Sequence, residues 1–384
     1  MRPWLSTLVV ATISFHEANL IIARSPSTAC EILAVNPDKL NEIVGKFAME
    51  LGASMQGPAI IIGEQLGFYK ELATHGPLAP EALAKNTGTA ERYVREWLAG
   101  QAAGGYVNFD PATGKYMMTP EQAFTLANED SPVYIPGAFY IVSSAYKDRG
   151  KLADAFRTGK GLGWHEHHND LFLGTHKFFR PGYLANLVNS WLPSLDGAVA
   201  KLKAGALVAD VGCGYGSSTI IMAKAFPKSR FFGYDYHLES IEWARNAAVT
   251  ENVSGNTTFE VALAKDYPRN GFDLVTFFDC LHDMGDPVGA AKHVHESLKP
   301  DGSWMIVEPY ANERVEENLN PVGRIFYNAS SMFCVPSSLA QEVGLAVGAQ
   351  AGDSKLQEIA SRGGFTRFRR AAQTPFNRIF EARP

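Results

Sequence analysis

The sequence predicts an α/β protein in which a Rossmann-like, doubly wound sheet follows a smaller, mainly helical winged-helix domain. From residue 191 onward, short apolar runs alternate with helical segments, which is typical of parallel strands joined by crossover helices. Between about residues 40 and 125, amphipathic helices precede a hairpin pattern. We expect four parts: an N-terminal extension at 1–38, a winged-helix domain at 39–125, a helical linker and lid at 126–190, and an α/β domain at 191–384.

Composition and charge narrow the class of protein. Of the 384 residues, 46% are hydrophobic and 20% are charged, which leaves room for more than one core. A net charge of -5 does not favour nucleic acid as the main partner. The cysteines have no metal-like spacing, so we expect reduced thiols in a cytoplasmic protein: Cys30, Cys213, Cys280 and Cys334.

The N-terminal extension contains one apolar run, from Leu5 to Phe15. Thr7 and Thr12 interrupt it, and it is much shorter than the roughly 20 apolar residues of a membrane span. No small-residue cleavage pattern follows closely. A peripheral extension is therefore favoured over a targeting segment, and no membrane partner is expected.

The next segment, from about Glu42 to Leu72, carries apolar residues at helical spacing. Gly57 and Pro58 predict a break or a close helix contact near residue 57, so we expect two buried helices rather than one long helix. A helix-turn-helix pattern follows, with its second helix at 90–103, and then a hairpin wing around the turn at 110–114.

A winged helix suggests DNA binding, with the helix at 90–103 in a major groove. Its charges argue against this, because Arg92 and Arg95 are offset by Glu91 and Glu96. Dimerisation, which would make the protein a homodimer, or formation of a lid is favoured instead.

The α/β domain contains seven strand candidates. They are 207–211, 230–234, 257–261, 274–278, 303–308, 366–371 and 376–382.

The first of these strands opens into a glycine loop. Asp210 closes the strand, and Gly212, Gly214 and Gly216 follow before a helix begins. Glycines allow tight turns and close approach of a ligand, and the helix N-terminus offers free N–H groups. The spacing is G-x-G-x-G rather than the dinucleotide pattern, and Asp210 could meet an ammonium group of the ligand.

The second strand ends at Asp235, about twenty residues after the loop. A carboxylate at this position accepts hydrogen bonds from the hydroxyls of a ribose. Tyr236 follows directly and could lie against an adenine ring.

From these motifs, the chain resembles the class I S-adenosylmethionine-dependent methyltransferases, and more closely a bacterial type with an N-terminal winged-helix domain. The resemblance implies S-adenosyl-L-methionine as cofactor, with the glycine loop on its methionine part and Asp235 on its ribose. It also implies that the segments at 365–370 and 376–381 form a closing hairpin with an antiparallel last strand. Tyr183 and Asp279 are further expected cofactor contacts. Leu263 stands where the family commonly has an acidic residue for the adenine amino group, so Asp266 or a backbone carbonyl is expected to replace it.

The segment after the fourth strand resembles the His-Asp segment of winged-helix O-methyltransferases. The resemblance implies that His282 is a general base, next to Asp283, and that Glu308 at the end of the next strand orients it. Histidine beside a carboxylate suits removal of a proton from a hydroxyl near neutral pH. The alternative is that His282 and Asp283 only cap a helix.

The acceptor is expected to be a small molecule held by aromatic and polar side chains: Trp164, His165, Arg324, Tyr327 and Phe333. Histidines at 165, 167, 168 and 176 could suggest a metal, but their spacing does not require one, and no metal is expected.

Three functions stay open. The favoured one is methylation of a hydroxyl. The second is S- or N-methylation of a small metabolite. The third is a DNA-binding regulator that senses S-adenosylmethionine.

Overall fold

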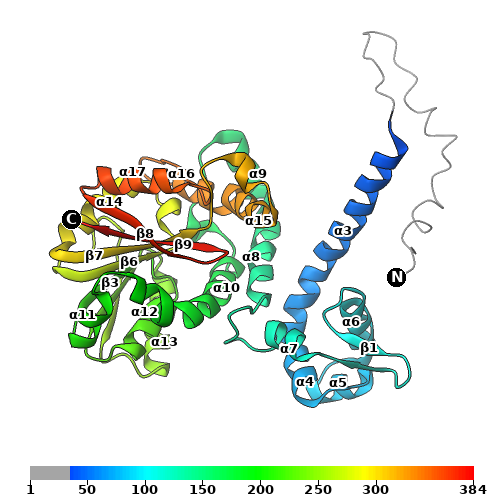
Figure 1. Ribbon diagram of the computed structural model, residues 1–384. Helices are drawn as coiled ribbons and strands as arrows, with labels where there is room; N and C mark the ends of the chain where they lie inside the picture. Colours follow the sequence, from blue (N-terminus) through cyan, green and yellow to red (C-terminus); the bar gives the residue numbers. More distant parts are fainter. Residues whose placement is uncertain (1–34) are drawn as a thin grey trace, which may run out of the picture. The chain divides into compact units, whose positions relative to one another are not determined.

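The computed structural model describes residues 35–384 (Figure 1). The apolar run at Leu5–Phe15, and with it nearly all of the expected extension, lies outside the described residues. Within the described range, no helix combines the length and apolar character needed to span a membrane.

The mainly helical N-terminal part has a small apolar core. Leu83, Val94 and Leu98 are almost completely buried, and Trp97 packs edge-on against Phe68 with ring centroids 4.9 Å apart. The expected second helix and its two-stranded wing are present. The elements are α3 (Pro37–Gln65), α4 (Phe68–His75), α5 (Pro80–Thr87), α6 (Glu91–Ala103), β1 (Asn108–Asp110), β2 (Lys115–Met117) and α7 (Pro120–Leu126).

The expected break near residue 57 is wrong. Helix α3 is continuous through Gly57 and Pro58, because proline removes only one backbone donor from a helix of 29 residues. The break comes at Gly67, whose φ of 73° is the left-handed conformation that ends helices. A run of exposed apolar side chains lies on α3 at helical spacing, with Ile43 65% exposed and Phe47 61% exposed.

The charges of α6 are paired within the winged-helix domain. The Arg92 guanidinium lies 2.6 Å from Glu96, and Arg95 lies 2.5 Å from Glu91 and 3.0 Å from Glu81. These pairs leave α6 without the continuous basic face that phosphate binding needs.

The linker is largely helical, as predicted. Helix α8 packs along α10, and the close contact explains Gly174, where a Cβ would lie 2.7 Å from the backbone of Ile141. The segment contains α8 (Pro136–Lys147), α9 (Arg149–Thr158), the 3₁₀ turn η2 (Trp164–Glu166), α10 (Asp170–Asn186), the π turn η3 (Leu187–Trp191) and η4 (Leu192–Ser194).

The α/β domain is built on a seven-stranded sheet of order β5-β4-β3-β6-β7-β9-β8. Strands β3 to β7 are parallel, and β9 runs antiparallel between β7 and β8, which confirms the predicted closing hairpin. All seven strand candidates are present. Their bounds are β3 (Leu207–Val211), β4 (Arg230–Asp235), β5 (Thr257–Val261), β6 (Phe272–Phe278), β7 (Leu298–Pro309), β8 (Arg367–Gln373) and β9 (Asn377–Arg383).

Helices cover both faces of this sheet (Figure 1). On one face lie α11 (Ala198–Ala204), α12 (Ser217–Ala225) and α13 (Leu238–Thr250), and on the other α14 (Pro287–Ser297) and α17 (Asp353–Arg362). The strand order reverses between β3 and β6, so a crevice is expected at the carboxyl ends of these strands. Short elements border it: η5 (Leu281–Asp283), η6 (Val315–Asn318), α15 (Pro321–Ala329), the π turn η7 (Ser330–Cys334) and α16 (Val335–Leu339).

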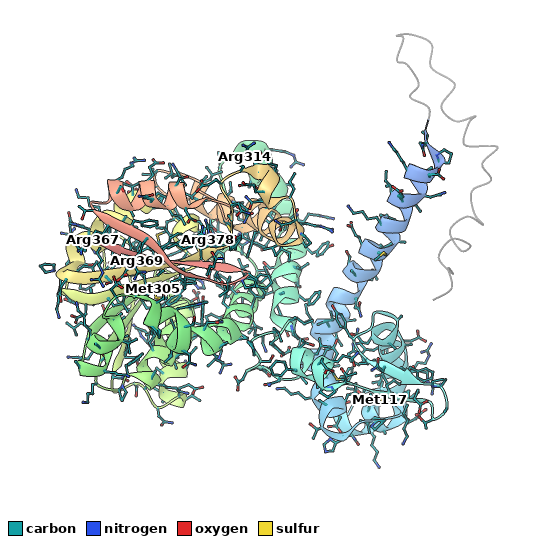
Figure 2. The ribbon with its side chains drawn as sticks, viewed as in Figure 1. Met117, Met305, Arg314, Arg367, Arg369 and Arg378 are labelled. Atoms are coloured by element: carbon teal, nitrogen blue, oxygen red, sulfur yellow. The ribbon has the colours of Figure 1, made fainter. Side chains whose placement is uncertain are left out.

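One buried arginine connects the closing hairpin to the carboxyl end of β7. Arg378 on β9 is 1% exposed and pairs with Glu308 in the β7–β9 register (Figure 2). Its guanidinium lies 2.6 Å from Asp353 and donates to the carbonyl oxygens of Pro309 and Ala351. The hairpin thereby fixes the end of β7, where Glu308 is placed.

Candidate active site

The glycine loop after β3 has the geometry that its sequence predicts. Gly212 and Gly216 have φ values of 73° and 78°, which side-chain-bearing residues rarely adopt. A Cβ on Gly212 would lie 2.8 Å from Sγ of Cys280, and one on Gly216 would lie 2.8 Å from the ring of Phe259. Both positions therefore require glycine, and the loop turns tightly into α12.

Asp210 stabilises the glycine loop through hydrogen bonds to the first residues of α12 and to β6. Its Oδ2 accepts hydrogen bonds from Ser218 at 2.6 Å and Thr219 at 2.5 Å, and its Oδ1 accepts one from Thr276 at 3.1 Å. Burial raises its pKa, and these hydroxyl donors act in the opposite direction. Its carboxylate is thus engaged within the protein, so a contact with a ligand ammonium group stays a prediction.

Asp235 lies at the carboxyl end of β4 beside the loop. Its Oδ2 accepts from the backbone N–H of Gly214, and its Oδ1 accepts from that of His237, both at 2.9 Å. Burial raises its pKa, against the effect of these backbone donors. Asp235 and Tyr236 both line the adjacent cavity.

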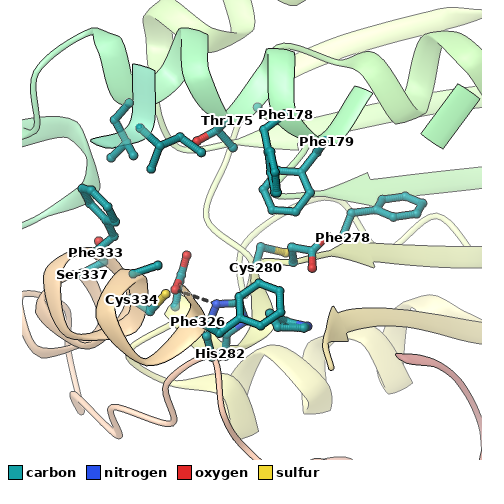
Figure 3. A pocket seen from close by; sticks show the side chains of 18 of the residues that line it. Thr175, Phe178, Phe179, Phe278, Cys280, His282, Phe326, Phe333, Cys334 and Ser337 are labelled. Carbon is teal, nitrogen blue, oxygen red and sulfur yellow. Dashed lines mark ion pairs between the residues drawn. The ribbon is translucent and has the colours of Figure 1, made fainter. Parts of the chain in front are cut away.

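A cavity of about 1440 Å³ opens at the carboxyl ends of the strands. At one end its wall is the glycine loop, and elsewhere it is mostly apolar with many aromatic side chains. Figure 3 shows Phe178 and Phe179 across the cavity from His282, with Phe333 at the left and Phe278 at the right.

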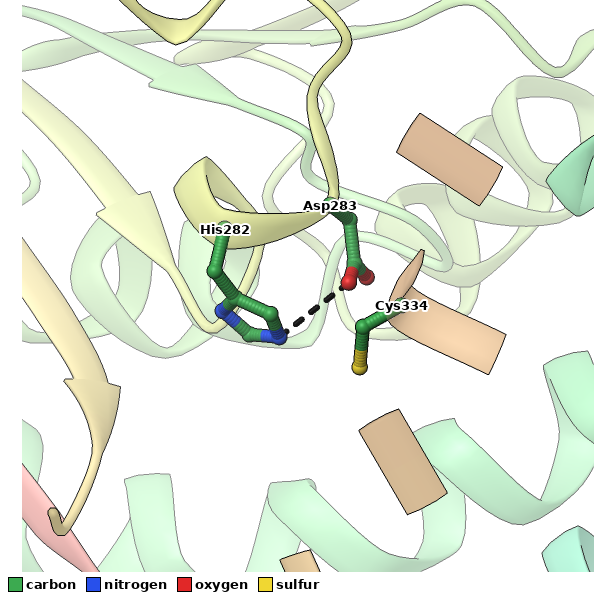
Figure 4. Close-up of side chains that lie close together, drawn as sticks. All are labelled: His282, Asp283 and Cys334. Carbon is green, nitrogen blue, oxygen red and sulfur yellow. Dashed lines mark ion pairs between the residues drawn. The ribbon is translucent and has the colours of Figure 1, made fainter. Parts of the chain in front are cut away.

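His282 reaches this cavity from η5 and lies between two carboxylates. Its Nδ1 is 2.5 Å from Oε2 of Glu308, and its Nε2 is 3.1 Å from Oδ1 of Asp283 (Figure 4). The backbone N–H of Leu281 donates to the second oxygen of Glu308 at 3.1 Å. Cys334 lies on the π turn η7. Its Sγ is within 4.8 Å of a ring nitrogen of His282 and of a carboxylate oxygen of Asp283.

The surroundings of His282 favour its charged form. Burial acts to lower its pKa, but Glu308 and Asp283 outweigh burial, and the pKa lies well above its ordinary value. The imidazole is therefore a stronger base than free histidine.

Asp279 lies at the end of β6, between the loop and His282. Its φ is 50°, and its Oδ1 accepts from Nδ2 of Asn377 at 2.8 Å. Burial raises its pKa well above the ordinary value, and Glu308 adds to the effect. Tyr183 from α10 is largely buried, interacts with Asp279 and lines the same cavity.

The structure brings most of the predicted site residues to one cavity. Its wall includes Trp164, Tyr183, Gly212, Gly214, Asp235, Tyr236, Asp279, His282, Asp283, Arg324, Tyr327 and Phe333. Five predicted residues do not line it: His165, Asp210, Gly216, Asp266 and Glu308. Near the expected adenine position the wall is formed by Ala262, Leu263 and Ala264.

The histidines near residue 165 do not converge on one point. The His167 ring is buried, with Nδ1 3.2 Å from Asp148, whereas Nδ1 of His168 accepts from the backbone N–H of Asp170. His176 on α10 instead meets Ser217 at 2.9 Å, and burial lowers its pKa to about 4.

Two contacts in the site had no signal in the sequence. Cys334 beside His282 and Asn377 beside Asp279 come from segments far along the chain. Only the folded topology brings them to these positions.

Two family models match the chain. One, described as a methyltransferase domain, matches residues 202–364, which contain the glycine loop, Asp235 and His282. The other, described as an Rv2258c-like winged HTH domain, matches residues 56–128. The chain therefore contains a methyltransferase domain, preceded by an Rv2258c-like winged HTH domain.

Solved structures share the fold of this chain over most of its length. Human N-acetylserotonin methyltransferase, in complex with S-adenosylmethionine, has a TM-score of 0.65 at 19% identity and covers 91% of this chain and 99% of its own. An O-methyltransferase family protein from Burkholderia thailandensis has a TM-score of 0.63 at 15% identity and covers 91% of this chain and 98% of its own. Identities this low establish the fold alone.

Curated relatives match a shorter segment of the methyltransferase. Phosphoethanolamine N-methyltransferase 3 from Arabidopsis thaliana is 32% identical over 109 residues, which is 28% of this chain and 22% of the relative. The chain spans between about a fifth and a half of the length of the curated relatives it matches.

Proposed function

We propose that this methyltransferase transfers a methyl group to a hydroxyl of an apolar small molecule, with His282 as general base. The observation that carries the proposal is the buried His282–Glu308 pair, in which His282 lines the same cavity as the glycine loop and Glu308 contacts it from behind. Asp283 is the neighbouring carboxylate that faces the other ring nitrogen.

The residues present fit the cofactor. Gly212 and Gly214 line the cavity next to the N-terminus of α12, and a Cβ on Gly214 would meet no protein atom within 4 Å, so we assign the methionine part of S-adenosylmethionine to this open side of the loop. Asp235 would hold the ribose and Tyr236 the adenine face, with the backbone around Leu263 or the side chain of Asp266 meeting the adenine amino group. When bound, the cofactor supplies an electrophilic methyl group on a sulfonium.

The chain's own residues supply the base. If the Nδ1 proton of His282 is donated to Glu308, Nε2 is the atom that accepts the acceptor's proton. A hydroxyl with a pKa near 10 needs this help at neutral pH, and general base catalysis contributes about 10²–10⁴-fold.

The cavity is large enough for a second ligand beside the cofactor. A pocket for one ligand typically measures about 300–1,000 Å³, whereas this cavity measures about 1440 Å³. Trp164, Arg324, Tyr327 and Phe333 line it, and His165 lies behind Tyr236 with ring centroids 6.0 Å apart. The many aromatic side chains of this mostly apolar wall favour a ring-containing acceptor with few charges.

Labelled methyl transfer tests the proposal. The full chain is incubated with S-adenosylmethionine and matched panels of phenols, thiols, thioethers and amines on the same ring systems. We expect transfer to phenols in wild type and a loss in His282→Gln. Transfer to a thiol or amine that His282→Gln retains would support the S- or N-methylation alternative instead.

We also propose a homodimer formed through α3. Apolar side chains repeat along this helix, with Ile43, Phe47 and Leu51 all exposed, and a second copy would cover them. The paired charges of α6 disfavour the regulator alternative, which salt-dependent binding to duplex DNA would revive. The free thiols Cys213, Cys280 and Cys334 fit a cytoplasmic location.

A further inference from the structure

Asp279 occupies the stretch of cavity wall between the cofactor loop and the proposed base. It directly follows β6, its neighbour Cys280 lies against Gly212, and His282 comes three residues later. In-line methyl transfer places the reacting sulfur and its methyl group between the cofactor's loop and the acceptor. Asp279 therefore faces the region where the positive charge of the methyl donor must lie.

The backbone conformation of Asp279 is unusual and its carboxyl group is only half used. A φ of 50° is uncommon for residues with a side chain, although aspartate and asparagine adopt it more readily than most. Oδ1 accepts from Asn377 and the Tyr183 side chain interacts with the carboxyl group, but Oδ2 is shielded from solvent and receives no hydrogen bond from the described residues. A buried polar atom without a partner in the protein is consistent with a group that serves a ligand.

The groups around Asp279 do not stabilise a negative charge before a methyl donor binds. Glu308 from β7 and Asp283 from η5 are carboxylates, and the one cationic group beside Asp279 among the described residues, His282, already lies between these two. The neighbours from β9 and α10 are Asn377 and Tyr183, which are both neutral. A buried carboxyl group without a cation of its own remains protonated.

We propose that Asp279 recognises the sulfonium charge of the methyl donor. Asp279 is uncharged before the donor binds, releases its proton to solvent when a sulfonium lies beside it, and rebinds a proton once the sulfur has become a neutral thioether. S-Adenosylmethionine then binds more tightly than S-adenosylhomocysteine, which favours product release. The inference rests on the proposed placement of the cofactor in the glycine loop, but not on the acceptor or on the role of His282.

Comparing S-adenosylmethionine with S-adenosylhomocysteine isolates the effect of the methyl group and its charge. The two ligands share the ribose and the amino-acid part, so any response of Asp235 or Asp210 is common to both. They differ in the methyl group and its charge, which only a group beside the sulfur can sense.

Calorimetry tests this with the full chain near neutral pH. Titrations with each ligand in buffers of different ionisation enthalpy give the number of protons released. We expect S-adenosylmethionine to release more protons than S-adenosylhomocysteine and to bind about tenfold more tightly, equivalent to a shift of one pKa unit. In Asp279→Asn both differences should disappear, and the S-adenosylhomocysteine affinity should be unchanged because asparagine tolerates a positive φ.

Asp235→Asn is the matched control. Removing the expected ribose contact should weaken both ligands by the same factor and leave their ratio and the difference in proton release unchanged. Equal proton release by both ligands in wild type, or a retained preference for S-adenosylmethionine in Asp279→Asn, would overturn the proposal. If neither ligand binds to wild type, the placement of the cofactor is wrong, whereas failure of the hydroxyl-methylation proposal would leave this result unaffected.

Discussion

The Nδ1 atom of His282 lies 2.5 Å from Oε2 of Glu308, and both side chains are almost completely buried. A carboxylate on Nδ1 fixes the ring orientation and directs Nε2 toward the cavity. In the structure Asp283 lies 3.1 Å from that Nε2. An acceptor hydroxyl must therefore replace the Asp283 contact before it can give its proton to His282.

Replacing the base should affect turnover far more than cofactor binding. We expect His282→Ala to lower kcat by about 10²–10⁴-fold, because proton removal then depends on water alone. Glu308→Gln should lower kcat less, since it weakens the orientation of His282 but keeps the imidazole. Rate measurements at saturating acceptor check this, with S-adenosylhomocysteine affinity as the control for folding. Unchanged kcat in His282→Ala would rule out the base role.

The pH dependence of turnover should reflect the carboxylates around His282. The neutral imidazole is the active form, and its pKa is raised, so activity should fall as pH decreases through a value above the ordinary 6.5. Asp283→Asn removes one of the negative charges that raise this pKa, and the acidic limb should move to lower pH. Profiles of kcat/KM measure the shift. Asp301→Asn changes an exposed carboxylate beside Lys201 and should leave the pH of the acidic limb unchanged.

The glycine loop gives a prediction about binding. Gly212→Ala places a Cβ 2.8 Å from Sγ of Cys280 at a φ of 73°, so the loop must shift away from its cradle geometry. We expect at least about a tenfold loss of cofactor affinity and a destabilisation of about 1–3 kcal/mol. Isothermal titration and denaturant unfolding measure the two effects. Gly100→Ala, at an open helical position, should leave affinity unchanged and should not destabilise the protein.

The sequence predicted the sheet well because strand signals are local. The apolar runs at 207–211 and 257–261 correspond to β3 and β5 without adjustment. The break predicted at Pro58 was wrong, since a long helix tolerates the loss of one hydrogen bond when its remaining turns are intact. Glycine and acidic residues at strand ends indicated the cofactor half of the site, because their chemistry depends on position along the strand.

The remaining contacts of the site depend on long-range topology. Cys334 reaches His282 through a π turn more than fifty residues later, and Asn377 reaches Asp279 across the closing hairpin. Neither residue carries a pattern in its own segment that specifies a partner. The strand order β6-β7-β9 places Asn377 beside Asp279, and the position of η7 places Cys334 beside the base.

The exposed apolar run of α3 predicts a concentration-dependent assembly. We expect the wild-type protein to be a dimer and Phe47→Glu to be a monomer, because a charge in the centre of a buried interface is costly. Light scattering after size-exclusion chromatography measures the mass. Lys46→Gln changes an adjacent exposed side chain that is not apolar and should leave the dimer intact. A monomeric wild type would contradict the dimer proposal.

Two arginines that share Asp353 should differ sharply in their contribution to stability. Arg378 is 1% exposed and also donates to the Pro309 and Ala351 carbonyl oxygens, so Arg378→Met leaves buried acceptors without donors. We expect a loss of about 3 kcal/mol in the free energy of unfolding. Arg370 contacts the same carboxylate from an exposed position, and Arg370→Met should cost about 0–1 kcal/mol.

Because Arg378 pairs with Glu308 across the β7–β9 ladder, Arg378→Met should also lower kcat, whereas Arg370→Met should not. Denaturant unfolding and initial rates measured on the same two variants test both parts, and equal losses of stability would contradict the role of burial.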